Sequence, residues 1–364
     1  MFFSAVKGNR SLLQSDQWGR LEGVKRLFQL NRFHNSRYRH TVFSDTRVTE
    51  RLKDIDSNDL RKINYHVAAQ LIKEGLLQPI GYLDGTVLGH RYYSGFGLMT
   101  RWGDILLMDV DPAGKRGKEL LSSQRLLERQ QLFWDAEVKL KYLLLDALYL
   151  NNRVLGWRER NLAEHLVIKY RPKDGEIAQR FRRMISAFES MVQQWEDVRD
   201  NRKRTQLSVQ MGFKEKRGED KAKGVWYHIY YARSNSYDKN YSIARIEEFR
   251  KGESLGMFYV FTTDKELSPE QLRKLGHQRW YIENDGFKLL NSQVNTKKYH
   301  LDNEVVYRNK LLIQILAVGL LMLFRRENGY RLSRIYGSVK LTLRFVGEVL
   351  FEGNFYIGAR WLDS

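Results

Sequence analysis

Three carboxylic acids lie in segments that are otherwise apolar. Asp84 is in the middle of the strand-like stretch QPIGYLDGTVLGH, Asp146 closes the run LLLD, and Glu283 lies in the helix-like stretch HQRWYIENDGFKLLN. An ionised carboxylate in an apolar setting is costly unless it is paired or binds a metal ion. These three acids are therefore the first candidates for chemistry in the chain.

Together, Asp84, Asp146 and Glu283 predict a metal site. Like charges repel one another at close range, and a divalent cation relieves that repulsion. Carboxylate oxygens with open coordination positions suit Mg²⁺ or Mn²⁺. Two such ions, about 3.5–4 Å apart, activate a water or a 3′-hydroxyl and stabilise the leaving oxygen at a phosphodiester. The residue types thus indicate metal-dependent chemistry on phosphodiesters.

Each acid alone also has a simpler interpretation. Asp84 could be a turn residue before Gly85, and Asp146 could cap a following helix. Glu283 could form a surface ion pair with Arg279, which lies four residues earlier on the same face of the expected helix over 277–291. Only the convergence of all three acids in one fold would make a site.

Two further acids, Asp109 and Asp111, compete for the same role. In the sequence MDVD their side chains point to the same side of a strand. Because they lie at the end of that strand, next to Pro112 and Gly114, we interpret them as loop-entry residues, or at most as outer contacts of the site. On this interpretation, the change Asp109→Asn is nearly silent.

Several kinds of chemistry are excluded by the composition and motifs. The chain has no cysteine, which removes disulfides, thiolate metal sites and thiol nucleophiles, and fits a reducing cytoplasm. It has neither an HExxH motif nor a GxxxxGK[ST] phosphate loop. The longest apolar run, 311–324, contains Gln314 and is too short for a comfortable membrane span, so it predicts a core helix. With no evident targeting signal, we expect a cytoplasmic protein.

Strand and helix patterns alternate over residues 79–171. Short strands with glycine-containing turns indicate an antiparallel meander, and the apolar run KYLLLDALYL indicates a central strand buried on both faces. The order of three strands, helix, strand, helix and strand is typical of the ribonuclease-H-like α/β fold, a mixed sheet flanked by helices. In that fold the first and fourth strands lie side by side, which would bring Asp84 and Asp146 together. The expected elements cover 78–90, 90–100, 103–110, 116–139, 141–150, 151–160 and 163–171.

A β-rich insertion is expected before the last catalytic helix. A helix (176–195) and a charge-dense loop (201–224) precede strands over 225–233, 241–250 and 255–264, and Ser268 with Pro269 starts the catalytic helix. Before the first strand, a helix capped by Ser57 or Asn58 runs to Gly75. The expected division is a helical N-terminal region in contact with DNA (1–78), the first part of the catalytic domain (79–171), the insertion (172–264), the catalytic and core helices (265–326) and a basic C-terminal tail (327–364).

Basic residues outnumber acidic ones by a wide margin. There are 62 Lys and Arg against 43 Asp and Glu, a net charge of +19. Such an excess indicates a polyanionic partner, most often nucleic acid, although a generally basic soluble protein has the same composition. Arg32, Arg37 and Arg39 alternate with aromatic residues, which suits phosphate contact and base stacking, or else a solvated loop. Lys203 and Arg204 in the charge-dense loop are further candidates for contact with the DNA backbone.

Three motifs resemble those of a known family. YLDGT (82–86), LLLDALYL (143–150) and QRWYIENDGF (278–287) are similar to the catalytic motifs of the DDE transposases of bacterial insertion sequences, in the group founded on insertion sequence four. The resemblance covers roughly residues 78–326. It implies catalysis by Asp84, Asp146 and Glu283, dependence on Mg²⁺ with Mn²⁺ as substitute, and cut-and-paste movement of a DNA element. It also implies a homodimer on the terminal repeats of double-stranded DNA, in the bacterial nucleoid.

The family also has a Tyr, Arg, Glu and Lys signature around the Glu. Arg279 matches the Arg and would hold a phosphate, but the Tyr position falls on Gly276 and the Lys position on Leu290. Lys288, Lys297 or Lys298 could supply the missing phosphate contact. Two alternatives to a transposase therefore stay open. One is a DNA-binding descendant that has lost activity, and the other is a ribonuclease-H-like nuclease that cuts without joining.

Overall fold

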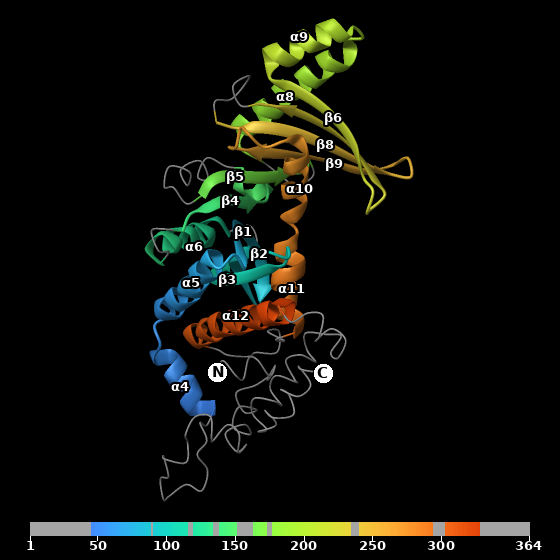
Figure 1. The fold of residues 1–364 in the computed structure, drawn as a ribbon. Helices are drawn as coiled ribbons and strands as arrows, with labels where there is room; N and C mark the ends of the chain where they lie inside the picture. Colours follow the sequence, from blue (N-terminus) through green and yellow to red (C-terminus); the bar gives the residue numbers. More distant parts are fainter. Residues whose placement is uncertain are drawn as a thin grey trace, which may run out of the picture. The chain divides into compact units, whose positions relative to one another are not determined.

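A mixed sheet flanked by helices forms the framework, which confirms the expected α/β class. The computed structural model describes residues 45–88, 90–115, 119–133, 138–150, 163–172, 177–233, 240–293 and 303–327. Within these residues the strand order is β3-β2-β1-β4-β5-β9-β8-β7-β6 (Figure 1). The strands are β1 (Leu77–Leu88), β2 (Arg91–Thr100), β3 (Ile105–Gly114), β4 (Leu140–Leu145), β5 (Ala163–Tyr170), β6 (Phe213–Asp220), β7 (Val225–Ala232), β8 (Ser242–Arg250) and β9 (Glu253–Thr262).

The chain groups into two compact units that divide it differently from the five expected segments. The first unit comprises 1–78, 85–135 and 282–364, and the second comprises 79–84 and 136–281. The helices of the first are α4 (Asp45–Asp54), α5 (Ser57–Lys73), α6 (Glu119–Phe133), the π-helix η3 (Ile282–Phe287), α11 (Lys288–Gln293) and α12 (Glu304–Glu327). Those of the second are the 3₁₀-helix η2 (Ala147–Tyr149), α8 (Gln179–Asp197), α9 (Asn201–Met211) and α10 (Pro269–Gln278).

In the first unit, β2 and β3 pair antiparallel, and β3 packs against α5, α6, α12 and η3. Helix α5 is the helix expected before the first strand, and Gly75 follows it with φ 71°, in the left-handed region that favours glycine. Its N-cap is Asp56, whose side chain accepts from the amide of Asn58, and not Ser57 or Asn58 as expected. Helix α12 contains the apolar run 311–324 and confirms a core helix there.

None of the helices that the structure describes has both the length and the apolar character needed to cross a membrane.

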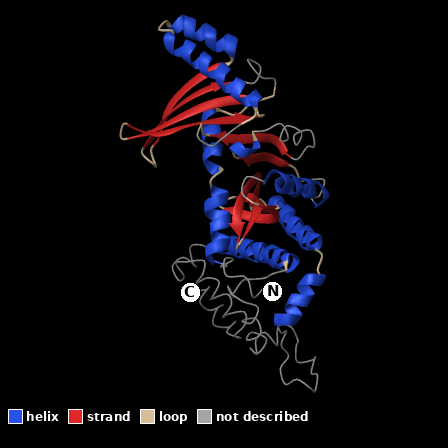
Figure 2. Ribbon diagram, turned by 180° about the vertical axis from the view of Figure 1, so that it is seen from behind, coloured by secondary structure: helices blue, strands red, loops and turns tan. Residues whose placement is uncertain are grey.

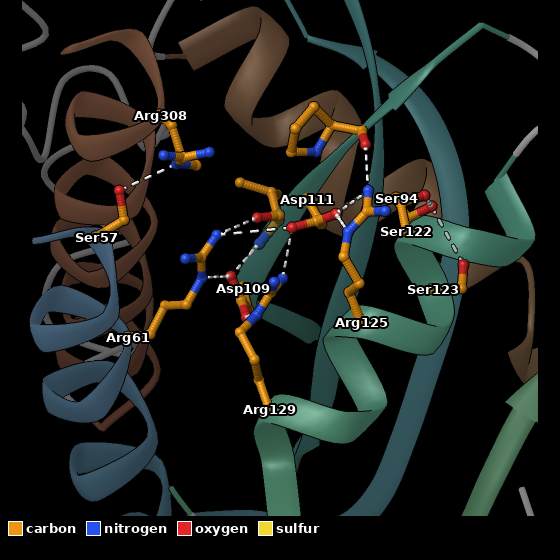
Figure 3. A network of polar contacts seen from close by, with 12 residues as sticks. Ser57, Arg61, Ser94, Asp109, Asp111, Ser122, Ser123, Arg125, Arg129 and Arg308 are labelled. Carbon is orange, nitrogen blue, oxygen red and sulfur yellow. Dashed lines mark hydrogen bonds and ion pairs between the residues drawn. The ribbon is translucent and has the colours of Figure 1, made fainter. Parts of the chain in front are cut away.

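The expectation that Asp109 and Asp111 enter a loop is wrong. Both lie inside β3 and are buried, with Asp109 fully so. Arg61 Nε lies 2.9 Å from Asp109 Oδ1, Arg125 Nε 2.7 Å from Asp111 Oδ2, and Arg129 Nη2 2.8 Å from Asp111 Oδ1 (Figure 3). Burial alone would lower the pKa of Arg129, but the carboxylates of Asp109 and Asp111 outweigh burial and raise the pKa above its usual value. The cluster is an ion-pair network that joins α5, β3 and α6.

We expect Asp109→Asn to lower the free energy of unfolding by about 3–5 kcal/mol, because it leaves the buried Arg61 and the half-buried Arg129 with one carboxylate fewer. Chemical denaturation followed by circular dichroism measures the change. Asp59→Asn is the control, since Asp59 pairs with Lys62 at exposed positions and should shift stability by about 1 kcal/mol at most. An Asp109→Asn variant as stable as the wild type would contradict the structural role of the network.

In the second unit, β4 and β5 are parallel, and the antiparallel strands β9, β8, β7 and β6 extend the sheet beyond β5. Helices α8 and α10 cover opposite faces of this part. Tyr259 of β9 donates its hydroxyl to Glu189 of α8, whereas its neighbour Val260 lies against Gly276 of α10. Because successive side chains of a strand alternate between faces, the two helices lie on different sides. Figure 2 shows α8 and α9 beside these strands.

The expected loop over 201–224 is wrong, because the segment forms α9, β6 and a turn. Asp200 caps α9 by accepting from the amide of Arg202, and Gly212 ends it with φ 56°. Strand β6 is the last strand of the sheet and carries mostly charged residues. Charges on an edge strand discourage pairing with another chain, so a charge-dense stretch can be a strand.

Candidate active site

The pairing of β1 with β4 brings two of the three candidate acids together. The strands are parallel, and Tyr82 lies opposite Leu144. Two residues further along each strand, Asp146 comes opposite Asp84 on the same face of the sheet, because side chains alternate along a strand. The backbone of Asp146 is still extended there (φ −94°, ψ −176°). The expected neighbourhood of the first and fourth strands is thus confirmed, and it aligns the two carboxylates.

Asp84 is a strand residue and not a turn residue. It lies within β1, is 8% exposed, and accepts a hydrogen bond from Arg279, with 2.9 Å between Arg279 Nη1 and Asp84 Oδ2. The next residue, Gly85, is packed closely against the side chains of Glu119 and Tyr92. A Cβ there would come within 2.6 Å of Glu119 Cγ and 2.9 Å of the Tyr92 hydroxyl. The DGT motif therefore marks a crowded strand.

Asp146 caps a short helix, as its simpler interpretation held. Its Oδ1 accepts from the amide of Leu148, 2.7 Å away, at the start of η2. This contact fixes the orientation of the carboxylate at the end of β4. A carboxylate has two oxygens with several lone pairs, so capping and cation binding are compatible roles for Asp146.

Glu283 lies on η3, and its side chain is partly exposed. The single helix expected over 277–291 is wrong, because α10 ends at Gln278 and residues 282–287 form a π-helical turn before α11. A π turn shifts the phase of the side chains that follow it, which lets Ile282, Phe287 and Leu290 all be buried. This change of phase explains why the apolar residues of 277–291 do not share one face of a regular helix. Glu283 also belongs to the first compact unit, whereas Asp84 and Asp146 belong to the second.

Among the residues that the structure describes, no three His, Asp or Glu side chains form a group that could hold a metal ion. Asp84 and Asp146 are instead a pair matched by strand register. Arg279, which was expected to hold a phosphate, is buried and ion-paired with Asp84. The described site is thus the pair of Asp84 and Asp146, in which Asp84 is ion-paired with Arg279.

Lys169 is a neighbour of this pair that the sequence interpretation missed. Leu145 lies opposite Ile168 in the parallel pairing of β4 with β5, so the next positions are Asp146 and Lys169. Lys169 is 4% exposed, and its Nζ lies 4.0 Å from the centroid of the Phe258 ring. Burying a lysine in the apolar strand VIKY is costly, as burying an acid is. A charged residue inside an apolar run is therefore the sequence signal that could have identified Lys169.

Helix α10 is held on the sheet so that Arg279, at its C-terminal end, reaches Asp84. It starts where the sequence predicts, with Ser268 and Gln271 forming a capping box and Pro269 in the first turn. Further along, His277 Nε2 lies 2.7 Å from Glu248 Oε1, and Arg273 Nε donates to the same oxygen over 2.7 Å. Burial raises the pKa of Glu248, but these two partners outweigh it and lower the pKa below its usual value.

The two positions that depart from the family signature are packing positions. A Cβ on Gly276 would lie 3.0 Å from Val260 Cγ2 and 3.2 Å from Phe258 Cε2, so the helix backbone approaches β9 closely. Leu290 is 2% exposed, while Lys288 on the same short helix is exposed. A tyrosine or a lysine at these places would have to enter the core.

The other basic candidates differ in their surroundings. Lys203 is exposed on α9. Arg204 donates from Nε to the carbonyl of Val198 over 2.6 Å and lies over the ring of Trp195. The remaining candidates lie outside the described residues. They are Arg32, Arg37, Arg39, Lys297 and Lys298.

Comparison with protein-family models and with curated proteins found no match for this chain. The function is therefore argued from the residues and their geometry.

We expect Gly276→Tyr to destabilise the protein by about 1–3 kcal/mol or more, because the new side chain would force α10 away from Val260 and Phe258. Thermal unfolding followed by circular dichroism measures the effect. Lys274→Tyr introduces the same side chain at an exposed position of the same helix and should leave the melting temperature nearly unchanged. Equal effects of the two substitutions would show that Gly276 is not a close-packing position.

Proposed function

We propose that the protein is a DDE transposase, which cleaves DNA strands and joins them to a target in a metal-dependent reaction. The observation that carries the proposal is the register between β1 and β4. Continued two residues past Tyr82 and Leu144, it sets Asp84, inside β1, opposite Asp146, directly after the carboxyl end of β4. The carboxyl end of a parallel strand is a common location of functional sites in α/β proteins. The motifs YLDGT and LLLDALYL contain these two acids.

The strand arrangement supports the finer assignment of a ribonuclease-H-like fold. An antiparallel pair, β2 and β3, is followed by the parallel strands β1, β4 and β5 in the order β3-β2-β1-β4-β5. Strands β6 to β9 come between β5 and α10 in the chain, as the β-rich insertion of the transposase group would. We therefore propose that α10 with η3 is the catalytic helix.

The donor set fits Mg²⁺, or Mn²⁺ in its place. Asp84 and Asp146 offer hard carboxylate oxygens on one face of the sheet. The resemblance of QRWYIENDGF to the transposase motif is what supports Glu283 as a third ligand. When bound, the metal activates the attacking hydroxyl and stabilises the leaving oxygen of the phosphodiester. The chain itself supplies the fixed position of the acids, since Asp84 is buried in β1 and Asp146 is oriented by its contact with Leu148.

The proposed partner is double-stranded DNA, bound by a homodimer at the terminal repeats of the element. The net charge of +19 supports a DNA partner, and the exposed Lys288 and Lys203 are described candidates for contact with phosphates. We also propose a bacterial cytoplasmic location at the nucleoid. If cations of the protein neutralise several phosphates, binding weakens steeply as the salt concentration rises.

A DNA-binding descendant without activity is the second candidate. It is favoured by Gly276 and Leu290, which are buried packing residues where the family has a tyrosine and a lysine. Lost contacts with the DNA end would leave folding and DNA binding intact while cleavage fails.

We expect Asp84→Asn, Asp146→Asn and Glu283→Gln each to abolish Mg²⁺-dependent cleavage, because each removes a carboxylate charge from the proposed metal site. The assay is nicking of a supercoiled plasmid that carries the element's flanking repeats, with DNA binding measured alongside and expected to persist. Glu253→Gln, an exposed acid at the start of β9, is the matched control and should cleave like the wild type. Full activity in any one of the three variants would overturn the assignment of that residue.

The products separate the candidate functions. Cleavage followed by joined strands supports the transposase, and cleavage without joining under the same conditions identifies a nuclease. Salt-sensitive binding with no cleavage by the wild type, on DNA with the correct ends, identifies the inactive descendant.

A further inference from the structure

We propose that Arg279 is an internal competitor of the metal ion. In the metal-free protein it neutralises Asp84, and a divalent cation has to displace it in order to bind. This inference rests on the proposed metal site. It adds a role for Arg279 as a positioning residue that sets the affinity of the site for the cation.

The contact between the two side chains is close and shielded. Arg279 Nη1 lies 2.9 Å from Asp84 Oδ2, and each residue is 8% exposed. An ion pair removed from water interacts more strongly than one at the surface, and removing one member leaves the other uncompensated. Asp84 is thus a neutralised acid in the metal-free state, although its strand register places it opposite Asp146.

Two cations of the chain lie beside the acid pair. Arg279 is ion-paired with Asp84, and Lys169 follows Ile168 in β5, which lies opposite Leu145, directly before Asp146. A divalent cation added to this arrangement would meet two fixed cations and two acids. Repulsion between the cation and the nearest guanidinium opposes binding unless Arg279 moves away.

The surroundings of Arg279 allow such a movement. It is the C-cap of α10, at the point where the regular helix ends before η3. Its guanidinium carbon lies 5.0 Å from the centroid of the Trp280 ring, and that of Arg171 lies 4.9 Å from the same ring. Arg279 has this ring contact together with its ion pair, so the contact can hold the guanidinium after Asp84 is released. Once released, the guanidinium is available to a phosphate.

Mn²⁺ binding measured by isothermal titration calorimetry tests the inference, without DNA and without any assay of activity. We expect Arg279→Gln to bind Mn²⁺ at least about tenfold more tightly than the wild type, because the competing charge is gone. A lower melting temperature in EDTA and a larger rise on adding Mn²⁺ should accompany this, since Asp84 has lost the guanidinium of Arg279 and a bound metal ion replaces that positive charge. A purely structural role would change stability and leave the affinity unchanged or weaker.

Arg273→Gln is the matched control. Arg273 is on the same helix and is also ion-paired, but its partners are Glu248 and Asp220. The variant loses the same charge and a comparable contact, and it should bind Mn²⁺ like the wild type. If Arg279→Gln does not fold in EDTA, folded protein should be recovered when it is prepared in Mn²⁺, and failure to recover it counts against the inference.

The outcomes separate this inference from the proposed function. Mn²⁺ binding that Asp84→Asn abolishes but that Arg279→Gln leaves unchanged or weakens overturns the competitor role and leaves the metal site standing. Equal tightening in Arg273→Gln assigns the effect to general charge and also overturns it. An absence of binding in the wild type and in Arg279→Gln overturns the metal site itself.

Discussion

Two carboxylates can serve one cation only if the backbone holds them in a fixed relation, and here the register between β1 and β4 provides that relation. Tyr82 opposite Leu144 determines that Asp84 comes opposite Asp146. A shift of one residue would turn one acid to the other face of the sheet. The parallel direction matters as well, since β1 runs past the carboxyl end of β4 and places Asp84 beside that end. The placement of α10 then decides which side chain meets the aligned acids, and Gly276 permits the close approach to β9 that lets Arg279 reach Asp84.

Two sets of buried acids in the described residues differ in the elements that their ion pairs join. Asp109 and Asp111 share three guanidinium groups, from Arg61, Arg125 and Arg129, and are committed to joining β3 with two helices. Asp84 is ion-paired with Arg279, at the end of a helix that breaks directly afterwards. A metal at Asp84 has to displace Arg279 at one helix end, whereas freeing Asp109 would disrupt a network between β3 and two helices. The same residue type is structural in one setting and a candidate ligand in the other.

Local signals in the sequence predicted the elements that local chemistry decides. The strands, the start of α10 at Ser268 and the core helix α12 follow from apolar patterns and capping residues. The failures involve partners that are distant in sequence. The role of Asp109 depends on Arg61, 48 residues earlier, and the π turn at Glu283 depends on three apolar residues that must all be buried. Strand β6 was not predicted because a charged strand at the edge of a sheet has the same amino-acid composition as a charged loop. Lys169 was overlooked although its burial cost equals that of the acids.

The mixed agreement with the transposase signature has a physical explanation in the packing of one helical stretch. Arg279 and Glu283 agree with the signature, and Arg279 contacts an acid of the proposed site. Gly276 and Leu290 disagree, and both serve packing, one against β9 and the other in the core around η3. A tyrosine or lysine could not enter these positions unless the helix moved. If the protein is a transposase, contacts with a DNA end have to come from other residues. Lys288 lies two positions before Leu290, and its exposed, positively charged side chain could contact a phosphate. If the proposed function holds, such contacts come from other residues, while the acid pair keeps its place in the sheet.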